Sequence, residues 1–236
     1  MFRKKNKKSR KHEGVNLITY IDKISPISEQ YRTIRTNIQY ASIDKQLQTF
    51  VVTSSGAGEG KSITAANLAI VFADTGKRTL LVDADLRKPS IAESFILDAH
   101  KGLSNLIADI DTGVENYIQH SDIPNLSILS SGIIPPNPSE LLASQRMNLV
   151  IEKLKNHYEI IIFDMPPVSV VTDAQIMSSK VDGTILVVRE GQTEKEGIAH
   201  AKNLLDRAQA NILGVVYNAT TRADKVGYYY AYGADS

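Results

Sequence analysis

A glycine-rich loop between an apolar strand and a helix constrains this chain more than any other feature. Residues 53–64 read TSSGAGEGKSIT and directly follow the apolar run at 50–52. Gly56, Gly58 and Gly60 allow backbone torsions that direct successive N–H groups at one anion, and the N-terminus of the following helix adds its positive dipole end. The pattern predicts a phosphate-binding loop after a strand of an α/β sheet.

Two residues of this loop have the side chains that nucleotide chemistry requires. Lys61 is expected to reach the β- and γ-phosphates of ATP, and the Ser62 hydroxyl is expected to ligate Mg²⁺. The usual pattern has glycine six places before the lysine, where this chain has Ser55. A glycine-rich loop without a ligand is the alternative, which the flanking strand and helix disfavour. The predicted nucleotide-binding residues are Gly56, Ala57, Gly58, Glu59, Gly60, Lys61, Ser62 and Ile63.

Two aspartates follow the apolar strand in the sequence LLVDADLRKP, at residues 80–89. Asp83 and Asp85 are two positions apart, which places both carboxylates on one side of a strand. Because parallel strands end at the same edge of a sheet, this pair is expected to face the phosphate loop. Taken alone, the pair could also cap a helix. Beside a phosphate loop, it predicts a second Walker motif.

A third carboxylate ends the apolar strand in IIIFDMPP, residues 160–167, where two prolines prevent the strand from continuing. In isolation, a strand-terminal aspartate such as Asp164 is more often a turn former. With the other motifs it predicts a Walker B carboxylate, which holds Mg²⁺ directly or through water. The predicted catalytic residues are Lys61, Asp83, Asp85 and Asp164, and the predicted metal ligands are Ser62, Asp83, Asp85 and Asp164.

Apolar runs alternate with helical periodicity along the rest of the chain. Strands are predicted at 50–52, 78–85, 126–129, 159–164, 184–188 and 212–217, and helices within 25–45 and at 60–73, 103–108, 139–158, 173–181 and 193–210. Short apolar strands that alternate with helices are typical of a mostly parallel sheet covered on both faces. The predicted fold is a doubly wound α/β P-loop NTPase.

Composition excludes several other classes. The chain has 236 residues, of which 42% are hydrophobic and 22% charged, as in ordinary globular proteins. The absence of cysteine excludes disulfide frameworks, thiolate metal sites and cysteine nucleophiles. The five histidines are scattered without metal-ligand spacing, so a zinc site or a hydrolase has no support. No apolar run approaches the roughly 18 residues that span a bilayer, so the expected location is the cytoplasm.

Basic residues are concentrated at the N-terminus. Seven of the 27 lysines and arginines precede Glu13, which leaves 20 basic and 26 acidic residues for the rest of the chain. This distribution does not indicate a nucleic-acid-binding domain, in which basic residues spread over a folded face. Two interpretations of residues 1–19 stay open: a solvated flexible tail, and a contact with an anionic membrane surface.

Tyrosines are concentrated at the other end, where four of the ten occur in the last nine residues. They are Tyr228, Tyr229, Tyr230 and Tyr232, bordered by Gly227 and Gly233. A segment this short can hardly bury four aromatic rings, so the rings are expected to be exposed and able to enter an active site as phosphoacceptors. The alternative is an oligomerisation strand or an aromatic patch.

Together these motifs resemble the bacterial tyrosine kinases that regulate capsule and exopolysaccharide synthesis, in the separate form found in Gram-positive bacteria. The resemblance covers residues 20–236 and includes SPISEQYRTIRTN and PPNPSELLAS besides the Walker motifs and the cluster YYYAY. Partition and cell-division-site ATPases share the three Walker motifs. They carry a signature lysine where this chain has Gly56, and they lack the tyrosine tail.

The resemblance implies an ATP- and Mg²⁺-dependent protein-tyrosine kinase that phosphorylates its own tail at Tyr228, Tyr229, Tyr230 and Tyr232. It implies ring-shaped octamers formed through an E-x-x-R-x-x-R motif at Glu29, Arg32 and Arg35, although these charges could equally be a solvated helix face. It further implies protein substrates, a cognate tyrosine phosphatase, and a membrane-embedded co-polymerase activator that recruits the kinase to the inner face of the plasma membrane. The implied domains are a basic tail at 1–19, a kinase domain with an oligomerisation helix at 20–222 and a tyrosine-rich tail at 223–236.

Phosphoryl transfer to a phenol is mostly positioning plus charge neutralisation. Because the phenol has a pKa of about 10, its proton must leave during or after attack. We expect Asp83 to accept it, with Asp85 and Asp164 organising Mg²⁺ and Lys61 neutralising charge, although sequence leaves the choice between Asp83 and Asp85 open. The alternative functions are a partition-type ATPase switch without kinase activity and a nucleotide-sensing scaffold without turnover.

Overall fold

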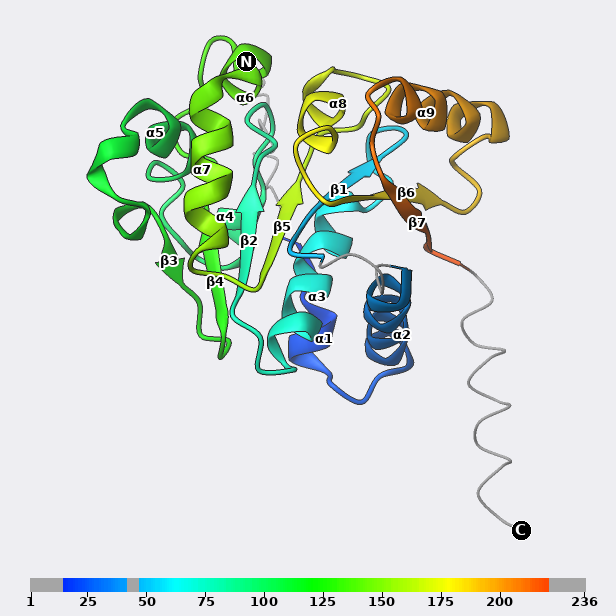
Figure 1. Ribbon diagram of the computed structural model, residues 1–236. Coiled ribbons are helices and arrows are strands. Elements are labelled where there is room, and N and C mark those ends of the chain that lie inside the picture. The colour runs from blue at the N-terminus through cyan, green and yellow to red at the C-terminus, as the bar shows by residue number, and fades with distance from the viewer. Residues whose placement is uncertain (1–14, 42–46, 221–236) are drawn as a thin grey trace, which may run out of the picture.

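The computed structural model describes residues 15–41 and 47–220, and seven strands in this part of the chain form one sheet in the order β3-β4-β2-β5-β1-β6-β7 (Figure 1). The strands are β1 (Thr49–Ser54), β2 (Thr79–Asp83), β3 (Gln119–His120), β4 (Leu126–Leu129), β5 (Ile160–Asp164), β6 (Gly183–Arg189) and β7 (Ile212–Asn218). Neighbouring strands are parallel, apart from the antiparallel pair β3 and β4. β1, which precedes the phosphate loop, lies between β5 and β6.

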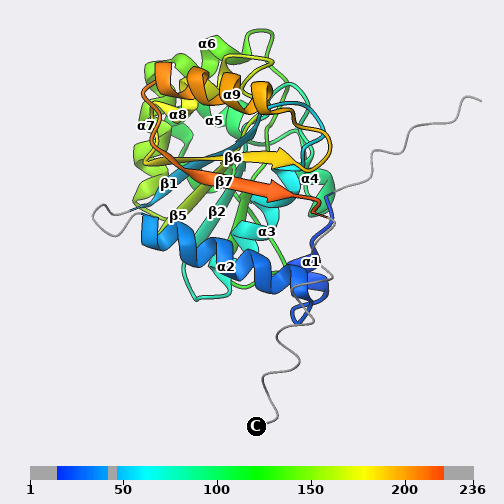
Figure 2. The same ribbon diagram turned by 90° about the vertical axis from the view of Figure 1, so that its right-hand side faces the viewer.

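Helices cover both faces of this sheet (Figure 2). One face carries α1 (Ile18–Ile21), α2 (Pro26–Ala41), α3 (Lys61–Ala73) and α4 (Ile91–Ser94). The other carries α5 (Leu103–Ala108), α6 (Pro138–Ala143), α7 (Gln145–Lys155), α8 (Asp173–Ser178) and α9 (Lys195–Arg207), with 3₁₀ turns at Ile110–Thr112 and Val114–Asn116 after α5. The predicted doubly wound α/β fold is therefore confirmed.

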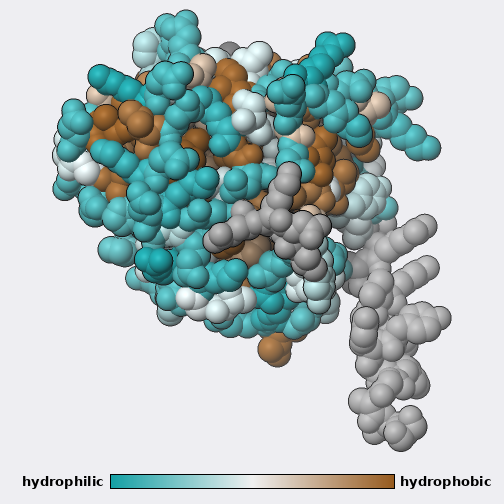
Figure 3. Space-filling view, in the orientation of Figure 1, coloured by the Kyte–Doolittle hydropathy of each residue, from teal (hydrophilic) through white to brown (hydrophobic). Residues whose placement is uncertain are grey.

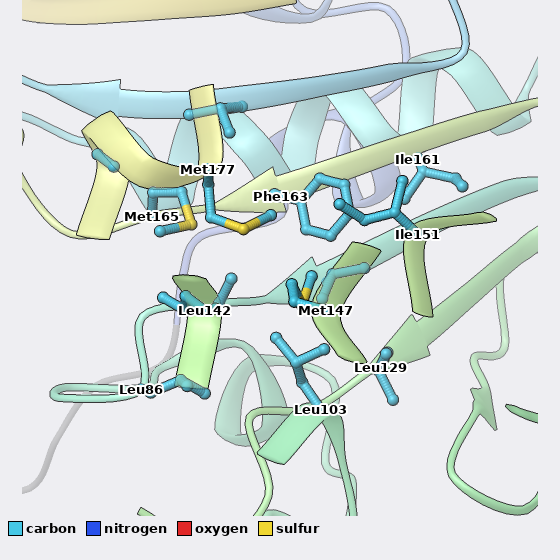
Figure 4. Close-up of a cluster of buried hydrophobic side chains, with 14 of the residues drawn as sticks. Leu86, Leu103, Leu129, Leu142, Met147, Ile151, Ile161, Phe163, Met165 and Met177 are labelled. Atoms are coloured by element: carbon cyan, nitrogen blue, oxygen red, sulfur yellow. The ribbon is translucent and has the colours of Figure 1, made fainter. Parts of the chain in front are cut away.

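The hydrophobic core divides into two clusters, one on each side of the sheet. Because successive residues of a strand point to opposite faces, Phe50 and Val52 pack with α2 and α3, whereas Val51 packs with the layer of α5 to α9. Figure 4 shows part of this second cluster, in which Phe163 of β5 lies near Met147 of α7. Burial on both faces explains why the strands read as continuous apolar runs.

The single helix predicted over 139–158 is wrong, because the chain forms two helices there. α6 ends at Ala143 and α7 begins at Gln145, since Ser144 adopts an extended conformation with φ of −62° and ψ of 156°. The Ser144 side chain accepts a hydrogen bond from the Met147 N–H and so caps α7. Ser144 thus ends one helix and caps the next, where the sequence predicted one continuous helix.

The other predicted strands and helices are present, with ends that differ by a few residues. Sequence did not predict the two-residue strand β3 or the single turn α4. β2 ends at Asp83, so Asp85 belongs to the loop that follows it. The expectation that Asp83 and Asp85 share one side of one strand is therefore wrong.

The surface seen in Figure 3 is mostly hydrophilic, with smaller hydrophobic patches. Among residues 15–41 and 47–220, no helix has the length and apolar character needed to cross a membrane. The basic segment predicted at 1–19 is described only from residue 15, and the tyrosine-rich segment at 223–236 lies outside the described residues. The structure therefore describes the predicted nucleotide site, whereas the predicted phosphoacceptors lie beyond its described part.

Candidate active site

The phosphate loop joins the end of β1 to the start of α3. Gly58 and Gly60 have φ of 77° and 95°, in the left-handed region that favours glycine. Gly60 is also constrained by its surroundings, because a Cβ there would lie 2.0 Å from Asn218 Nδ2. α3 begins at Lys61, so the free N–H groups of its first turn adjoin the loop. Of the three glycines in the predicted pattern, Gly58 and Gly60 adopt the left-handed conformation and Gly56 does not.

Lys61 lies among the carboxylates that the Walker motifs predicted. Its Nζ is 3.0 Å from Asp85 Oδ2 and 3.5 Å from Asp164 Oδ1. Nζ also donates to Ser62 Oγ at 3.1 Å. Burial acts to lower the pKa of Lys61, but attraction to Asp164 and Asp85 outweighs it and raises this pKa above its usual value. Lys61 is therefore positively charged, and it lies at the end of the phosphate loop.

Asp83 and Asp164 are fully buried and occupy paired positions on the neighbouring strands β2 and β5. Asp83 Oδ2 accepts hydrogen bonds of 3.0 Å from the backbone N–H groups of Ser90 and Ile91, where α4 begins. Burial, followed by repulsion from Asp164, raises the pKa of Asp83 to about 7. Burial also raises the pKa of Asp164, against the opposing effects of Lys61 and of a hydrogen bond with Ser62. This pair of carboxyls can thus gain or lose a proton near neutral pH.

These residues fit a hydrated Mg²⁺ ion. Asp83 Oδ1 and Asp164 Oδ2 are buried acceptors without a hydrogen-bond partner among the described residues. Buried polar atoms normally have partners, so two such oxygens on paired residues indicate room for a ligand that the protein does not supply. The described residues contain no cluster of three or more His, Asp or Glu arranged as a metal cage. Mg²⁺ does not need one, because it keeps several waters and binds through one or two carboxylates and substrate phosphates.

Asp85 differs from Asp83 in its surroundings. Its Oδ1 accepts from the backbone N–H groups of Arg87 at 3.3 Å and Lys88 at 3.0 Å, while its Oδ2 contacts Lys61. Two backbone donors fix the carboxylate in one orientation toward the lysine. The structure thus separates the two aspartates that sequence could not rank: Asp85 pairs with Lys61, and Asp83 is the deeper carboxyl next to Asp164.

Sequence analysis assigned no role to Arg87, Ser139 or Asp173, which the structure brings together beside the Asp85 loop. Arg87 donates from Nε to Asp173 Oδ2 at 2.9 Å and from Nη2 to Asp173 Oδ1 at 3.0 Å. Ser139 Oγ donates to Asp173 Oδ1 at 2.5 Å and accepts from Arg87 at 2.9 Å. This fork ties the loop after β2 to α6 and α8. The sequence signal that could have identified Arg87 was its position two residues after Asp85.

The predicted oligomerisation residues lie on α2, but they do not form one free stripe. Glu29 pairs with Arg32, which also donates to the Lys23 carbonyl at 2.6 Å. Arg35 instead donates to the carbonyl of Val71 in the last turn of α3, at 2.7 Å. Both arginines of the motif therefore bind within this chain, and Arg35 satisfies a carbonyl in the last turn of α3. The predicted phosphoacceptors Tyr228, Tyr229, Tyr230 and Tyr232 lie outside the described residues.

Known sequences similar to this chain include tyrosine-protein kinases. A family model described as an AAA domain matches residues 47–215. The tyrosine-protein kinase YwqD of Bacillus subtilis (strain 168) is 44% identical over 228 residues, which cover 96% of this chain and 95% of that protein. The putative tyrosine-protein kinase CapB of Staphylococcus aureus is 39% identical over 211 residues, with coverage of 89% and 92%. These similarities extend over nearly the whole chain.

Solved structures show the same relationship. The chimerical protein CapA2B2 has a TM-score of 0.82 at 40% identity and covers 86% of this chain and 89% of its own. The kinase domain of the Escherichia coli tyrosine kinase ETK has a TM-score of 0.82 at 28% identity, with coverage of 89% and 82%. The septum site-determining protein MinD of Pyrococcus horikoshii, solved with Mg-ADP, has a TM-score of 0.62 at 24% identity and coverage of 75% and 72%. The last similarity shows the fold alone.

The kinases match at higher identity and over more of the chain than the cell-division ATPase does. This difference favours the predicted tyrosine kinase over the ATPase switch. The site residues Lys61, Asp83, Asp85 and Asp164 lie together at the phosphate loop of the P-loop fold. The chain therefore belongs to the bacterial tyrosine-protein kinases of the capsule and exopolysaccharide type, as its motifs predicted.

Proposed function

We propose that this kinase uses ATP and Mg²⁺ to phosphorylate tyrosines of its own C-terminal segment, and that this modification regulates capsular or extracellular polysaccharide synthesis and export. The observation that carries the proposal is the meeting of Lys61 with Asp85 and Asp164 at the phosphate loop, next to a buried Asp83 whose pKa lies near 7. Such a group of one cation and three carboxyls matches what phosphoryl transfer requires.

The chain's own residues have separate tasks in nucleotide binding. The backbone of residues 56–63 would hold the phosphates through its N–H groups, and Lys61 would exchange its longer contact with Asp164 for a phosphate oxygen while Asp85 keeps the lysine oriented. Ser62 and Asp164, which are hydrogen-bonded to each other, would hold Mg²⁺ directly, and Asp83 and Asp85 would contact it through its water molecules. Bound Mg²⁺ supplies neutralisation of the negative charge that builds up on the phosphates.

Asp83 is our proposed general base. A base works best with a pKa near the operating pH, and the pKa of Asp83 is raised to about 7 while one of its oxygens has no hydrogen-bond partner among the described residues. Its other oxygen is fixed by the N–H groups at the start of α4. A phenol that approaches this free oxygen can transfer its proton to it. Asp85 is less suited to act as the base, because Lys61 contacts its Oδ2 and the backbone N–H groups of its loop bind its Oδ1.

The proposed assembly is a ring-shaped homo-octamer in which the C-terminal segment of one subunit enters the active site of its neighbour. The acceptors would be Tyr228, Tyr229, Tyr230 and Tyr232. On α2, Glu29 and Arg32 are the exposed part of the motif that would contact a neighbouring subunit, whereas Arg35 contacts α3. Further proposed partners are a membrane-embedded co-polymerase activator, a cognate tyrosine phosphatase and other protein substrates. We propose no nucleic-acid partner.

We further propose that the kinase acts in the cytoplasm at the inner face of the plasma membrane, recruited there by its activator. Its proposed domains are the basic tail at 1–19, the kinase domain at 20–222 and the tyrosine-rich tail at 223–236. The seven basic residues before Glu13 support a contact with anionic lipid, which contributes about 1 kcal/mol per basic residue. Deletion of residues 1–11 is expected to weaken recruitment at low salt, and unchanged recruitment would show that the tail has no such role.

Mapping of phosphate by tandem mass spectrometry tests the kinase reaction. The protein is incubated with Mg·ATP, with and without the cytoplasmic segment of its activator, beside Lys61→Met and the matched control Lys202→Met on an exposed face of α9. Phosphate on residues 228–232 is expected in the wild type and in Lys202→Met but not in Lys61→Met. Unmodified tyrosines together with measurable ATP hydrolysis would instead support the ATPase switch.

The identity of the base needs a separate comparison of Asp83→Asn with Asp85→Asn. Loss of general-base catalysis lowers kcat by about 10²- to 10⁴-fold. Asp83→Asn is expected to show that loss while MgADP binding is retained. Asp85→Asn is expected to weaken nucleotide binding as well, because its carboxylate orients Lys61. A reversed pattern would assign the base to Asp85.

A further inference from the structure

The carbonyl groups of residues 56–60 in the phosphate loop each accept a hydrogen bond. Four consecutive carbonyls each accept a hydrogen bond from a side chain: Gly56 from Ser54 at 2.7 Å, Ala57 from Gln192 at 2.9 Å, Gly58 from Arg189 at 3.1 Å, and Glu59 from Asn218 at 2.9 Å. The next carbonyl, that of Gly60, accepts the first hydrogen bond of α3 from the Thr64 N–H at 2.9 Å. Three of the four side chains come from residues more than 130 positions later in the chain.

The opposite side of these peptides is free. In a planar trans peptide, the C=O of one residue and the N–H of the next point in opposite directions. Donors that hold the carbonyls of residues 56–59 on one side therefore direct the N–H groups of residues 57–60 to the other side. Among the described residues, none accepts a hydrogen bond from these four N–H groups. Backbone N–H groups normally have a hydrogen-bond partner, so these four N–H groups are available to an acceptor from a ligand.

The donors are themselves held in place. The turn between β6 and α9, residues 189–193, is closed by hydrogen bonds from the N–H groups of Gln192 and Thr193 to the Arg189 carbonyl at 3.2 Å and 3.0 Å. The Arg189 N–H donates to Thr193 Oγ1 at 2.8 Å, and Thr193 Oγ1 donates to Glu59 Oε1 at 2.6 Å. The Glu190 N–H donates to the Asn218 carbonyl at 3.0 Å, which ties the turn to the end of β7.

We propose that Arg189, Gln192 and Asn218 are positioning residues that hold the phosphate loop by its carbonyls, so that its N–H groups converge on the phosphates of the nucleotide. The three residues form a clamp that acts on nucleotide binding through the loop. This inference rests on the proposed function, in which the loop binds ATP. Preorganised donors increase affinity because the loop does not have to be ordered when the nucleotide binds.

Asn218→Ala tests the clamp, and β7 offers a matched control. Asn211 lies at the opposite end of the same strand and also donates one amide hydrogen bond to a carbonyl, that of Asp182, at 2.7 Å. Both variants lose an amide hydrogen bond to a carbonyl, and Asn218→Ala also loses the one that Asn218 Oδ1 accepts from the Ala219 N–H at 2.8 Å, but only Asn218 holds the phosphate loop. A third variant, Gln192→Ala, alters an exposed side chain and keeps the test valid if Asn218→Ala folds poorly.

The first measurement is the binding of a fluorescent ADP analogue with Mg²⁺ to the full-length protein. Asn218→Ala and Gln192→Ala are each expected to raise Kd about 2- to 10-fold, the range for loss of one neutral hydrogen bond, and Asn211→Ala to leave it unchanged. In turnover, KM for ATP is expected to rise by the same factor while kcat changes less, because the clamp acts on binding. Equal Kd values for the wild type and all three variants would overturn the proposal.

The second measurement is amide hydrogen exchange in the nucleotide-free protein, read on peptides that cover residues 55–62. Loss of a clamp residue is expected to speed exchange in this loop, whereas Asn211→Ala is expected to leave it unchanged. Unchanged exchange in both Asn218→Ala and Gln192→Ala would overturn the clamp. Absence of nucleotide binding by the wild type would instead contradict the proposed function, and the exchange measurement would still decide on the clamp.

Discussion

Asp83 and Asp164 face each other across paired positions of β2 and β5, each with one buried carboxylate oxygen that has no partner among the described residues. Two carboxyl groups in this relation cannot both be ionised without cost, so one of them retains a proton toward neutral pH or a cation lies close by. Lys61 reaches Asp164 but is held more closely by Asp85. The pKa of both carboxyls is raised, that of Asp83 to about 7, so this pair binds a proton near neutral pH in the free enzyme.

This relationship predicts how the stability of the metal-free protein depends on pH. Asp83 has a reference pKa of 3.8 and a folded-state pKa of about 7, so the folded state retains a proton that the unfolded state releases between these values. Stability is therefore expected to fall as pH rises from about 4 to about 7 and to change little above that range through this group. Asp83→Asn removes the effect.

The measurement is the thermal midpoint of wild type and Asp83→Asn in EDTA, across pH 5 to 8. Because one pKa unit corresponds to about 1.4 kcal/mol, the variant is expected to be more stable at pH 8 by at least about 1–2 kcal/mol. The advantage should shrink toward pH 5, where the wild-type carboxyl keeps its proton. A difference between the two proteins that is the same at every pH would contradict the raised pKa.

Substitution of Arg87 should show that the fork to Asp173 stabilises the fold. Asp173 is fully buried, whereas the Arg87 side chain is 38% exposed, so the cost of an unpaired carboxylate is reduced by solvent screening. We expect Arg87→Ala to lower the free energy of unfolding by about 1–3 kcal/mol. In a double-mutant cycle with Asp173→Ala, the coupling energy is expected to exceed about 1 kcal/mol.

The control for that cycle is the exposed ion pair of Lys202 and Asp206 on α9. Pairs of this kind couple by about 0.3–0.5 kcal/mol. Urea unfolding of both sets of variants gives the comparison. A coupling between Arg87 and Asp173 no larger than that of the α9 pair would show that the fork is not a stabilising contact.

The two arginines of the α2 motif should behave differently. Arg35 donates to a carbonyl at the end of α3, so Arg35→Ala is expected to destabilise the isolated subunit by about 1–3 kcal/mol, the range for hydrogen bonds to charged groups. Arg32 belongs to a surface pair with Glu29, and Arg32→Ala is expected to cost less than about 1 kcal/mol. Urea unfolding at low protein concentration measures both.

Light scattering at high concentration then separates assembly from folding in the same variants. If α2 is the oligomerisation helix, Arg32→Ala lowers the molar mass of the assembly while the subunit stays folded. Loss of assembly in Arg35→Ala alone, in proportion to its loss of stability, would attribute the motif's effect to folding of the subunit.

Substitution of Gly60 should weaken nucleotide binding. Its φ of 95° is strained for any other residue, and a Cβ would displace Asn218. We expect Gly60→Ala to weaken MgADP binding at least about 10-fold, which corresponds to about 1.4 kcal/mol. Gly76→Ala is the matched control, because Gly76 has a φ of 84° but open space around it. That variant should lose about 1–2 kcal/mol of stability and keep its affinity, and equal affinities of the two variants would contradict the role of Gly60.

Sequence alone was sufficient for the features that depend on neighbours along the chain. The glycines of residues 56–60, the apolar runs of the buried strands and the periodicity of α2 are local patterns, so the fold class and the position of the phosphate loop followed from them. Strand ends also placed Asp164 at the correct edge of the sheet. The break at Ser144 is harder to predict from sequence. The free energies of a capped helix start and of a continuous helix differ by only about 1 kcal/mol.

Only the tertiary structure decided which side chains meet. The contact of Lys61 with Asp85, the pairing of Asp83 with Asp164 and the fork of Arg87 with Asp173 join segments that are far apart in the sequence. Because β2 ends at Asp83, Asp85 lies in the loop that follows. Two aspartates that look alike in the sequence therefore have different surroundings in the structure. The donors from residues 189–192 and 218 reach the phosphate loop because β6 lies beside β1 in the sheet and β7 lies beside β6. These distances cannot be predicted from the spacing of residues in the sequence, because the packing of the sheet and its helices determines them.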